Sequence, residues 1–329
     1  MILIISEPAD IHSTVVAQRL LERGEDVCIL STEHYPQQCN ISWHVRAGAP
    51  GFSLKYGERV IASDEVRGVW VRRLKPFAIA PSVVDRQVEH FSYNECRDFF
   101  IGWLSTFDNV INACQQEYLA ARKLMQLYCA SGLGLRTPET LISNDPEKIE
   151  AFYHNRKCEI IFKPLTGTAF QFTGAHLFDD AHLQTIQATS LAPCIFQERI
   201  TVKENLRITI IDQDVFAASI KVGREYAKID WRLERSPVIE PYKLPVEIED
   251  KLIKLQRRLG LRYGAIDMIL NEQDEYVFLE NNPGGQFLFI EVPTRMPISQ
   301  ALAGALLTRA ANDADHGVVS GGGRPAVNA

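Results

Sequence analysis

The segments Tyr-Gly-Ala-Ile-Asp-Met-Ile-Leu (263–270) and Tyr-Val-Phe-Leu-Glu-Asn-Asn-Pro-Gly-Gly-Gln-Phe (276–287) decide the fold of this chain. Each is apolar enough for a buried strand, and the polar turn at 272–274 predicts that they pair as a hairpin. The pairing places Asp267 within about one residue of directly opposite Glu280, where Cβ atoms are roughly 5 Å apart. Asn282 lies on the same strand face as Glu280, because side chains alternate.

Asp267, Glu280 and Asn282 are therefore predicted to form a site of oxygen ligands for Mg²⁺. Two carboxylates this close repel each other unless a cation lies between them, and a buried, unpaired carboxylate is costly. Magnesium prefers such hard oxygen ligands and accompanies nucleotide phosphates. The alternative is a hairpin with one structural pair of acids. The apolar residues that flank both acids argue for a buried hairpin and favour the metal site.

The composition is that of an ordinary globular protein with two or three subdomains. The chain has 329 residues, of which 46% are hydrophobic and 23% charged. Its net charge of −6 argues against nucleic acid as a partner. Seven scattered cysteines without a Cys-x-x-Cys motif predict a reducing, cytoplasmic location. No segment approaches the ~20 apolar residues of a membrane span, and no signal peptide is expected.

The order of apolar patterns predicts an α/β protein. A β-α-β opening over residues 2–30 indicates a parallel α/β subdomain, and it lacks the Gly-x-Gly-x-x-Gly of dinucleotide sites. Helices are expected at 88–104, 115–130 and 246–259, and strands at 68–76, 160–164 and 195–200. The expected parts are an N-terminal domain (1–110), a central subdomain (111–195), a C-terminal subdomain (196–312) and a flexible tail (313–329).

Two lysines are candidates for binding phosphate. Lys163 ends a predicted strand and precedes the loop Leu-Thr-Gly-Thr-Ala-Phe-Gln-Phe-Thr-Gly (165–174), whose small residues let backbone N–H groups approach an anion. Lys123 lies on the predicted helix 115–130, beside an apolar face of Leu119, Leu124, Leu127 and Tyr128. A plain strand end and a solvated helix lysine are the alternatives. The loop is not a Walker P-loop, because no Gly-Lys-Ser/Thr follows its glycines.

A second hairpin, 206–211 with 215–221 across Asp212-Gln213-Asp214, carries cations. We expect Arg207 opposite Ser219, with Asn205 and Lys221 on the same face. Such a face would present positive charge to a phosphate and metal site, and Arg232 would add to it. The alternative is a solvated outer face. The other face is expected to carry Ile208, Ile210, Phe216 and Ala218.

In their order along the chain, these elements resemble the ATP-grasp ligases over about residues 110–310. Residues 1–110 look like the α/β domain that precedes the grasp. Three motifs resemble the graspetide (microviridin-type) synthetases, which install side-chain ester or amide crosslinks in a ribosomal precursor peptide. These are Asn-Pro-Gly-Gly-Gln-Phe-Leu-Phe-Ile-Glu (282–291), Val-Trp-Val-Arg-Arg (69–73) and Ile-Asp-Trp-Arg (229–232).

The resemblance implies a pre-ATP-grasp domain followed by two lobes whose antiparallel sheets clamp ATP. Lys123 and Lys163 would hold the phosphates, with Lys221 beside them, and Asp267, Glu280 and Asn282 two Mg²⁺ ions. Gln197, Glu198, Arg199 and Ile200 would take adenine and Glu204 the ribose, although these residues alone fit a polar linker equally well. Arg207 and Arg232 would stabilise the transferring phosphate. Arg72, Arg73 and Ser219 would face the substrate, and the two arginines suit a domain interface equally well.

The implied reaction forms an acyl phosphate on a peptide Asp or Glu, which a Ser, Thr or Lys side chain of the same peptide then attacks. It needs no protein nucleophile, and the sequence shows neither Gly-x-Ser-x-Gly nor a Cys–His pair. The implied partners are a precursor peptide with a leader and a second copy of the chain. The alternatives are a ligase that adds an amino acid to a free carboxylate, as ribosomal-protein glutamate ligases do, and a non-catalytic ATP-binding regulator.

Overall fold

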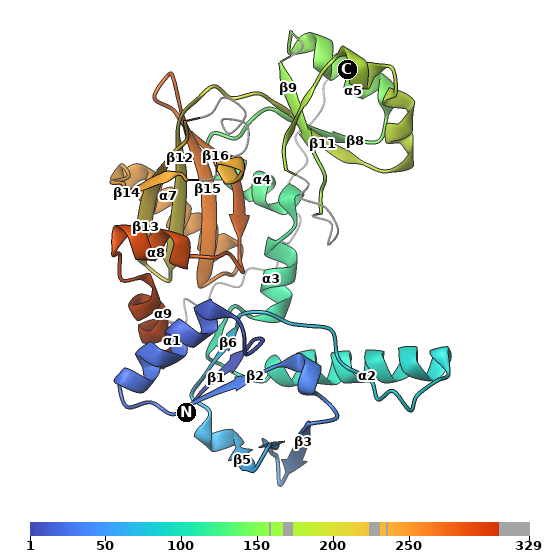
Figure 1. The fold of residues 1–329 in the computed structure, drawn as a ribbon, viewed down its shortest axis with the longest axis vertical. Helices are drawn as coiled ribbons and strands as arrows, with labels where there is room; N and C mark the ends of the chain where they lie inside the picture. The colour runs from blue at the N-terminus through green and yellow to red at the C-terminus, as the bar shows by residue number, and fades with distance from the viewer. Residues whose placement is uncertain (158, 167–173, 224–230, 235, 309–329) are drawn as a thin grey trace.

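A computed structural model describes residues 1–157, 159–166, 174–223, 231–234 and 236–308 (Figure 1). Most of the predicted phosphate loop (167–173), part of the Ile-Asp-Trp-Arg motif (229–230) and the predicted tail lie outside the described residues. None of the helices in the described ranges has the length and apolar character needed to cross a membrane. The α/β class is confirmed, with one parallel sheet followed by antiparallel sheets.

The N-terminal domain is built on a parallel sheet in the order β2-β1-β6-β7. Every residue of the central strand β1 is buried, as in a sheet that is covered on both faces. Helix α2 and the antiparallel sheet β3-β4-β5 cover one face, and α1 with the C-terminal helix α9 covers the other. The elements are β1 (Ile2–Ile5), α1 (Ile11–Glu22), β2 (Val27–Leu30), β3 (Cys39–Arg46), β4 (Ala49–Tyr56), β5 (Arg59–Ala62), β6 (Gly68–Val71), α2 (Arg86–Leu104) and β7 (Val110–Ile111).

The central lobe is a four-stranded antiparallel sheet in the order β10-β9-β11-β8. Helix α5 packs on it through a small core that includes Ile149, Tyr153 and Phe196. The border predicted between residues 195 and 196 falls inside β11, so this lobe extends to Glu198. Its elements are β8 (Thr140–Ser143), α5 (Pro146–Asn155), β9 (Ile160–Lys163), β10 (His176–Phe178), α6 (Asp180–Leu183) and β11 (Cys194–Glu198).

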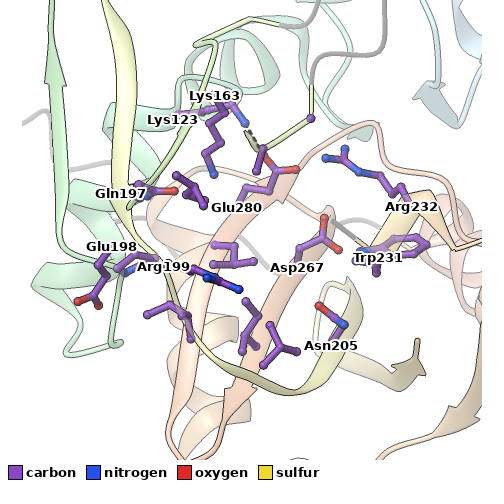
Figure 2. A pocket seen from close by; sticks show the side chains of 18 of the residues that line it. Lys123, Lys163, Gln197, Glu198, Arg199, Asn205, Trp231, Arg232, Asp267 and Glu280 are labelled. Carbon is purple, nitrogen blue, oxygen red and sulfur yellow. Dashed lines mark hydrogen bonds and ion pairs between the residues drawn. The ribbon is translucent and has the colours of Figure 1, made fainter. Parts of the chain in front are cut away.

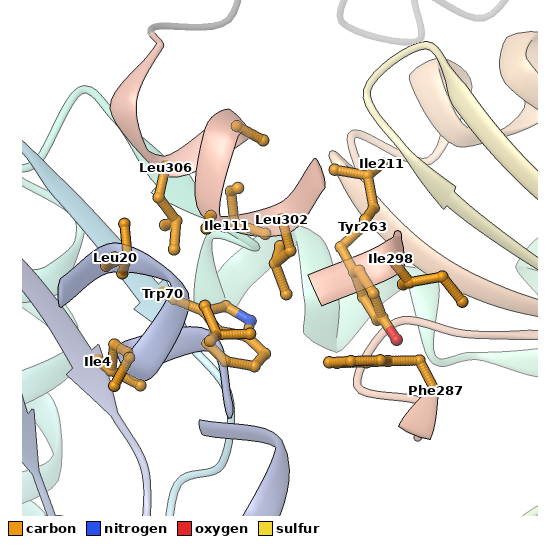
Figure 3. Close-up of a cluster of buried hydrophobic side chains, with 14 of the residues drawn as sticks. Ile4, Leu20, Trp70, Ile111, Ile211, Tyr263, Phe287, Ile298, Leu302 and Leu306 are labelled. Carbon is orange, nitrogen blue, oxygen red and sulfur yellow. The ribbon is translucent and has the colours of Figure 1, made fainter. Parts of the chain in front are cut away.

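The C-terminal lobe is an antiparallel sheet in the order β14-β13-β12-β15-β16. Helices α4 and α7 cover one face. On the other side a single apolar cluster joins the sheet to the N-terminal domain, from Ile4 and Trp70 through Leu302 to Tyr263 and Phe287 (Figure 3). The elements are β12 (Val202–Ile211), β13 (Asp214–Lys221), β14 (Val238–Pro241), α7 (Val246–Arg258), β15 (Tyr263–Asn271), β16 (Tyr276–Asn282), α8 (Leu288–Thr294) and α9 (Ile298–Leu307).

The single helix predicted at 115–130 is two helices, α3 (Cys114–Ala120) and α4 (Lys123–Gly132). Lys123 therefore stands at the first turn of α4 rather than inside a long helix. The apolar residues expected on one face are largely exposed, Leu119 by 56%, Leu124 by 55% and Tyr128 by 66%. The helices instead bury small or polar side chains, Ala120, Gln126, Cys129 and Ala130, against the C-terminal lobe.

The register predicted for β12 and β13 was wrong by one residue. Arg207 pairs with Ala218, and Ser219 pairs with Leu206. The cause is a turn of two residues, Asp212 and Gln213, in place of the expected three, with Asp212 at φ 51°. A shift of one residue moves every side chain of a strand to the other face. Ser219 therefore shares the face of Ile208 and Ile210, while Phe216 and Ala218 share the face of Arg207.

Candidate active site

A cavity of about 300 Å³ lies between the central sheet and the C-terminal sheet (Figure 2). Strands β9 and β11 form one wall, β12, β15 and β16 form the other, and α4 contributes Lys123. The structure thus brings together segments that are up to about 160 residues apart in the chain. Nine of the predicted site residues line the cavity: Lys123, Lys163, Gln197, Glu198, Arg199, Ile200, Arg232, Asp267 and Glu280.

The two acids of the decisive hairpin are paired as predicted. Asp267 is directly opposite Glu280, and a bulge at Leu279 follows immediately. Arg207 Nη1 donates to Asp267 Oδ1 at 3.0 Å, and the Lys123 ammonium forms an ion pair with Glu280. Each carboxylate is therefore compensated by its own cation, one from the neighbouring strand and one from α4.

The pair titrates unequally. Burial raises the pKa of Asp267, although the Arg207 guanidinium opposes this, and the Glu280 carboxylate raises it further. Burial alone would also raise the pKa of Glu280, but the ammonium groups of Lys123 and Lys163 outweigh it and hold this pKa at about 2. Glu280 therefore stays ionised at any physiological pH and needs no deprotonation before it can bind a cation.

These residues fit a magnesium site. Asn282 lies on the face of Glu280, since it pairs with Ala265 two residues from Asp267. Its Oδ1 accepts the Gly284 N–H at 3.1 Å, which fixes the amide. The described residues hold no cluster of three His, Cys, Asp or Glu side chains suited to a metal. Mg²⁺ bound with nucleotides typically takes one or two carboxylates and completes its shell with phosphate and water, and this donor set meets that need.

The two lysines lie together above the carboxylates (Figure 2). Burial, together with the neighbouring charge of Lys123, lowers the pKa of Lys163 to about 8. A phosphate brought into the cavity would favour the protonated form of Lys163. The lysine pair is thus suited to an anion.

The far end of the cavity suits an adenine ring. Ile161, Ile269 and Leu279 provide apolar walls. Gln197 is 1% exposed, and its Oε1 has no hydrogen-bond partner within the described ranges, although its Nε2 donates to Thr140 Oγ1 at 2.9 Å. A buried acceptor without a donor is costly, and an exocyclic amino group is the kind of donor that would satisfy it.

Not all of the predicted side chains face the cavity. Glu198 turns away from the cavity in Figure 2 and lies beside Arg136 and Arg156, so only its backbone is available to a ligand. Lys221 is exposed and pairs with Glu240, and Glu204 pairs with Leu270 at the edge of a bulge. Neither of these, nor Ser219, lines the cavity. The predicted pairing of Arg207 with Ser219 is wrong, and the ligand contacts predicted for Glu204, Lys221 and Ser219 stay predictions.

Arg207 is held by aromatic residues that the sequence alone did not identify. Its guanidinium lies 5.7 Å from the centroid of Phe289, and Trp231 stacks on Phe289 at 5.5 Å. Gly285 makes room for it, because a Cβ there would meet Ala265 Cβ at 2.4 Å and Arg207 Nη2 at 2.8 Å. The Gly-Gly-Gln-Phe ending therefore shapes the site of Arg207.

Every carbonyl of the loop 283–286 accepts a hydrogen bond from a side chain. Asn112 donates to Pro283 O at 3.0 Å, and Arg72 Nη1 donates to Gly284 O at 2.6 Å. Tyr263 donates to Gly285 O at 2.7 Å, and Arg207 donates to Gln286 O at 3.2 Å. Arg72 is buried and also forms an ion pair with Asp10, so its observed contacts belong to the domain interface. Arg73 is exposed.

Gln126 fixes the strand that carries Glu280 and Asn282, and sequence reasoning missed it. Its Oε1 accepts the Asn281 N–H at 2.9 Å, and its Nε2 donates to Asn281 O at 2.6 Å and to Ala120 O at 2.7 Å. β16 is the edge strand of the sheet, so Gln126 replaces a missing neighbour strand at the residue between Glu280 and Asn282. The only signal in the sequence is its spacing of three residues from Lys123 on one helix face.

The chain matches two family models in succession. Residues 1–118 match the MvdD pre-ATP grasp domain, and residues 119–306 match the RimK-like ATP-grasp domain. The chain belongs to the ATP-grasp ligases. It is an ATP-dependent ligase of the MvdD and RimK type, as the resemblance predicted. No curated protein matches it.

Solved structures of peptide-modifying ligases share this architecture. Macrocyclase MdnC from Microcystis aeruginosa MRC, bound with precursor peptide MdnA, is 31% identical, with a TM-score of 0.82 over 93% of this chain and 99% of that one. A RiPP-associated ATP-grasp ligase of Chryseobacterium gregarium, in complex with ADP and a leader and core peptide, is 27% identical, with a TM-score of 0.85 over 93% and 96%. PsnB complexed with a minimal precursor, Mg and ADP is 23% identical, with a TM-score of 0.75 over 93% and 97%. The chain is thus a macrocyclase-like member of the family.

Proposed function

We propose that this ligase phosphorylates Asp or Glu side chains of a ribosomal precursor peptide and closes them with Ser, Thr or Lys side chains of the same peptide into ester or amide rings. The observation that carries the proposal is the cavity between the two sheets. There the Asp267–Glu280 pair, the lysine pair and the unsatisfied Gln197 amide converge. The precursor peptides bound to MdnC and to the C. gregarium ligase support the substrate class.

The nucleotide would lie along the cavity. Asp267, Glu280 and Asn282 would hold two Mg²⁺ ions, which neutralise and orient the phosphates. Lys123 and Lys163 would bind the phosphate oxygens. The 197–200 segment would take the adenine, through the Gln197 Oε1 atom and backbone groups of Glu198 to Ile200.

The chemistry has two steps. An oxygen of the peptide carboxylate bonds to the γ-phosphorus of ATP, and the bond to the bridging oxygen breaks, so ADP leaves. A hydroxyl oxygen or amine nitrogen of the same peptide then bonds to the acyl carbon. Phosphate leaves with the electrons of the acyl C–O bond and takes up the proton that the nucleophile loses. Arg207, which is paired with Asp267, and Arg232, which lines the cavity, would stabilise the charge on the transferring phosphate and on the acyl phosphate. The protein otherwise contributes to the rate by positioning the reacting groups.

The test is to incubate the protein with ATP, Mg²⁺ and an acidic precursor peptide encoded beside its gene, and to weigh the product. The peptide should lose the mass of one water for each ring, and fragmentation should locate the linkage and identify it as ester or amide. A mass gain of one amino acid would instead indicate a ligase of the glutamate-adding kind. An unchanged peptide would refute the proposal. The homodimer and the cytoplasmic location stay predictions, which light scattering and cell fractionation test.

A further inference from the structure

A second cavity, of about 840 Å³, lies outside the nucleotide site, between the end of β6, helix α2 and helix α3. Figure 1 shows α3 running from the ATP-grasp part of the molecule down to the N-terminal domain, with α2 below it. Residues that are close in the chain line the two cavities. Arg122 lines the second cavity and Lys123 the nucleotide cavity, while Gly284 lines the second and Glu280 the first. A ligand in the second cavity therefore lies next to the metal-binding strand.

The second cavity carries an excess of positive charge. Arg73 and Arg122 line it, and within the described residues neither guanidinium forms an ion pair or hydrogen bond. Arg72 is paired with Asp10, but its buried Nη2 has no hydrogen-bond partner in the described ranges. The one acid among the lining residues is Glu117, and burial raises its pKa to about 7. The lining thus holds two arginines without an ion-pair partner in the described residues, and one carboxyl group that is partly neutral at physiological pH.

The same cavity has apolar walls. The Arg122 guanidinium lies over the ring of Tyr118, 3.9 Å from its centroid, and Tyr118 is 64% exposed. Leu119 and Leu74 are exposed beside it, and Ile101 of α2 lines the same space. Large exposed apolar side chains that meet in one hollow usually mark an interaction site. Cations between apolar walls suit an extended peptide that carries carboxylates next to apolar residues.

We propose that this cavity binds an acidic segment of the peptide substrate, with its carboxylates on Arg73 and Arg122 and its apolar side chains against Tyr118 and Leu119. The inference rests on the proposed function for the class of ligand, and it assigns a place for the part of the peptide that is not being phosphorylated. Because Arg122 and Gly284 line this cavity while Lys123 and Glu280 line the nucleotide cavity, a peptide bound there would be held near the reaction site, which raises the effective concentration of the reacting carboxylate.

The test measures binding without catalysis. The probe is a short fluorescein-labelled peptide of glutamate, serine and phenylalanine, and its matched control has glutamine in place of glutamate. Fluorescence anisotropy should show that Arg73→Glu and Arg122→Glu each weaken binding of the acidic peptide by about tenfold or more, and that added salt weakens it in the wild type. Tyr118→Ala should weaken both peptides. Arg46→Glu, the same charge change on β3 away from this cavity, should match the wild type, and all variants should bind ADP normally.

Equal binding of the acidic and glutamine peptides, or wild-type affinity in both arginine variants, would overturn the inference. The result is separable from the proposed function. If the variants form rings in the precursor at the wild-type rate and KM, the second cavity is not the peptide site although the ligase activity stands. If the arginines control binding but no peptide ever loses water, the binding site stands and the proposed reaction falls.

Discussion

Glu280→Gln removes one charge from the carboxylate pair and hardly changes the size of the side chain. Asp267 would remain opposite an amide, and Lys123 would lose its ion-pair partner. Because one of two carboxylates that orient the metal and phosphates is lost, we expect ATP turnover to fall by about 10²–10³-fold or more. The fold should persist, because the loss of stability expected from the charges of the Asp267–Glu280 pair is small.

The pKa of Glu280 is about 2, against an ordinary value of 4.5. At about 1.4 kcal/mol per pH unit, the ionised carboxylate contributes about 3 kcal/mol to the stability of the native state above pH 4.5. That contribution is lost as the pH falls from 4.5 toward 2. The Glu280→Gln variant recovers part of this stability, because Asp267 no longer faces a like charge. The free energy of unfolding at neutral pH should therefore fall by about 1–3 kcal/mol, less than the total of a typical domain.

The assay is phosphate release with precursor peptide and Mg²⁺, beside urea unfolding followed by circular dichroism. Glu272→Gln is the matched control, since it makes the same chemical change on an exposed residue in the turn of the same hairpin. The control should keep wild-type turnover and stability. Turnover of Glu280→Gln within a few-fold of that control would refute the role of the pair in metal binding. An unfolded variant would show that the stability argument is wrong.

Three further perturbations test the surroundings of the pair. Because the pKa of Lys163 is about 8, binding of MgADP at pH 8 should take up protons, and affinity should fall as the pH rises above 8. Calorimetry in two buffers of different ionisation enthalpy measures the uptake, which Lys163→Met should abolish. Gln126→Met removes three hydrogen bonds around Asn281 and Ala120. It should raise the Mg²⁺ concentration for half-maximal activity by about tenfold, and an unchanged Mg²⁺ dependence would contradict its positioning role. Gly285→Ala places a Cβ 2.4 Å from that of Ala265 and should lower the free energy of unfolding by about 1–3 kcal/mol. Gly102→Ala, in α2 with nothing within 4 Å, should raise it by up to about 1 kcal/mol. Equal effects of Gly285→Ala and Gly102→Ala on the free energy of unfolding, measured with urea, would refute the packing argument.

The pairing of Asp267 with Glu280 was predictable because two local rules agree at this hairpin. Strand alternation fixes the face of each side chain, and counting back from a clear turn fixes which residues are opposite. The neighbouring hairpin follows the same rules, yet its register was wrong. The turn closes with two residues rather than three because Asp212 adopts a positive φ, and the composition of Asp212-Gln213-Asp214 does not specify which turn forms.

The missed parts of the site depend on contacts between distant segments. Gln126 is buried by its bonds to β16, 155 residues along the chain, and nothing near it in the sequence marks that partner. Arg72 was named from the sequence with two interpretations left open, and the contact with Gly284 that orients it comes from a loop more than 200 residues away. Sequence patterns also located the apolar side chains of the predicted helix 115–130, but whether they are buried depends on which other elements pack there. The break at Ala121 turns that face outward.

In the proposed reaction, a carboxylate of the peptide is activated by phosphorylation between the two sheets. The direct measurement uses a precursor peptide whose Asp and Glu carboxylates carry oxygen-18. If the acyl phosphate forms, one labelled oxygen passes to phosphate for each ring that closes, and mass spectrometry of the released phosphate should show one oxygen-18 per water lost from the peptide. Rings that form while the phosphate stays unlabelled would contradict the account.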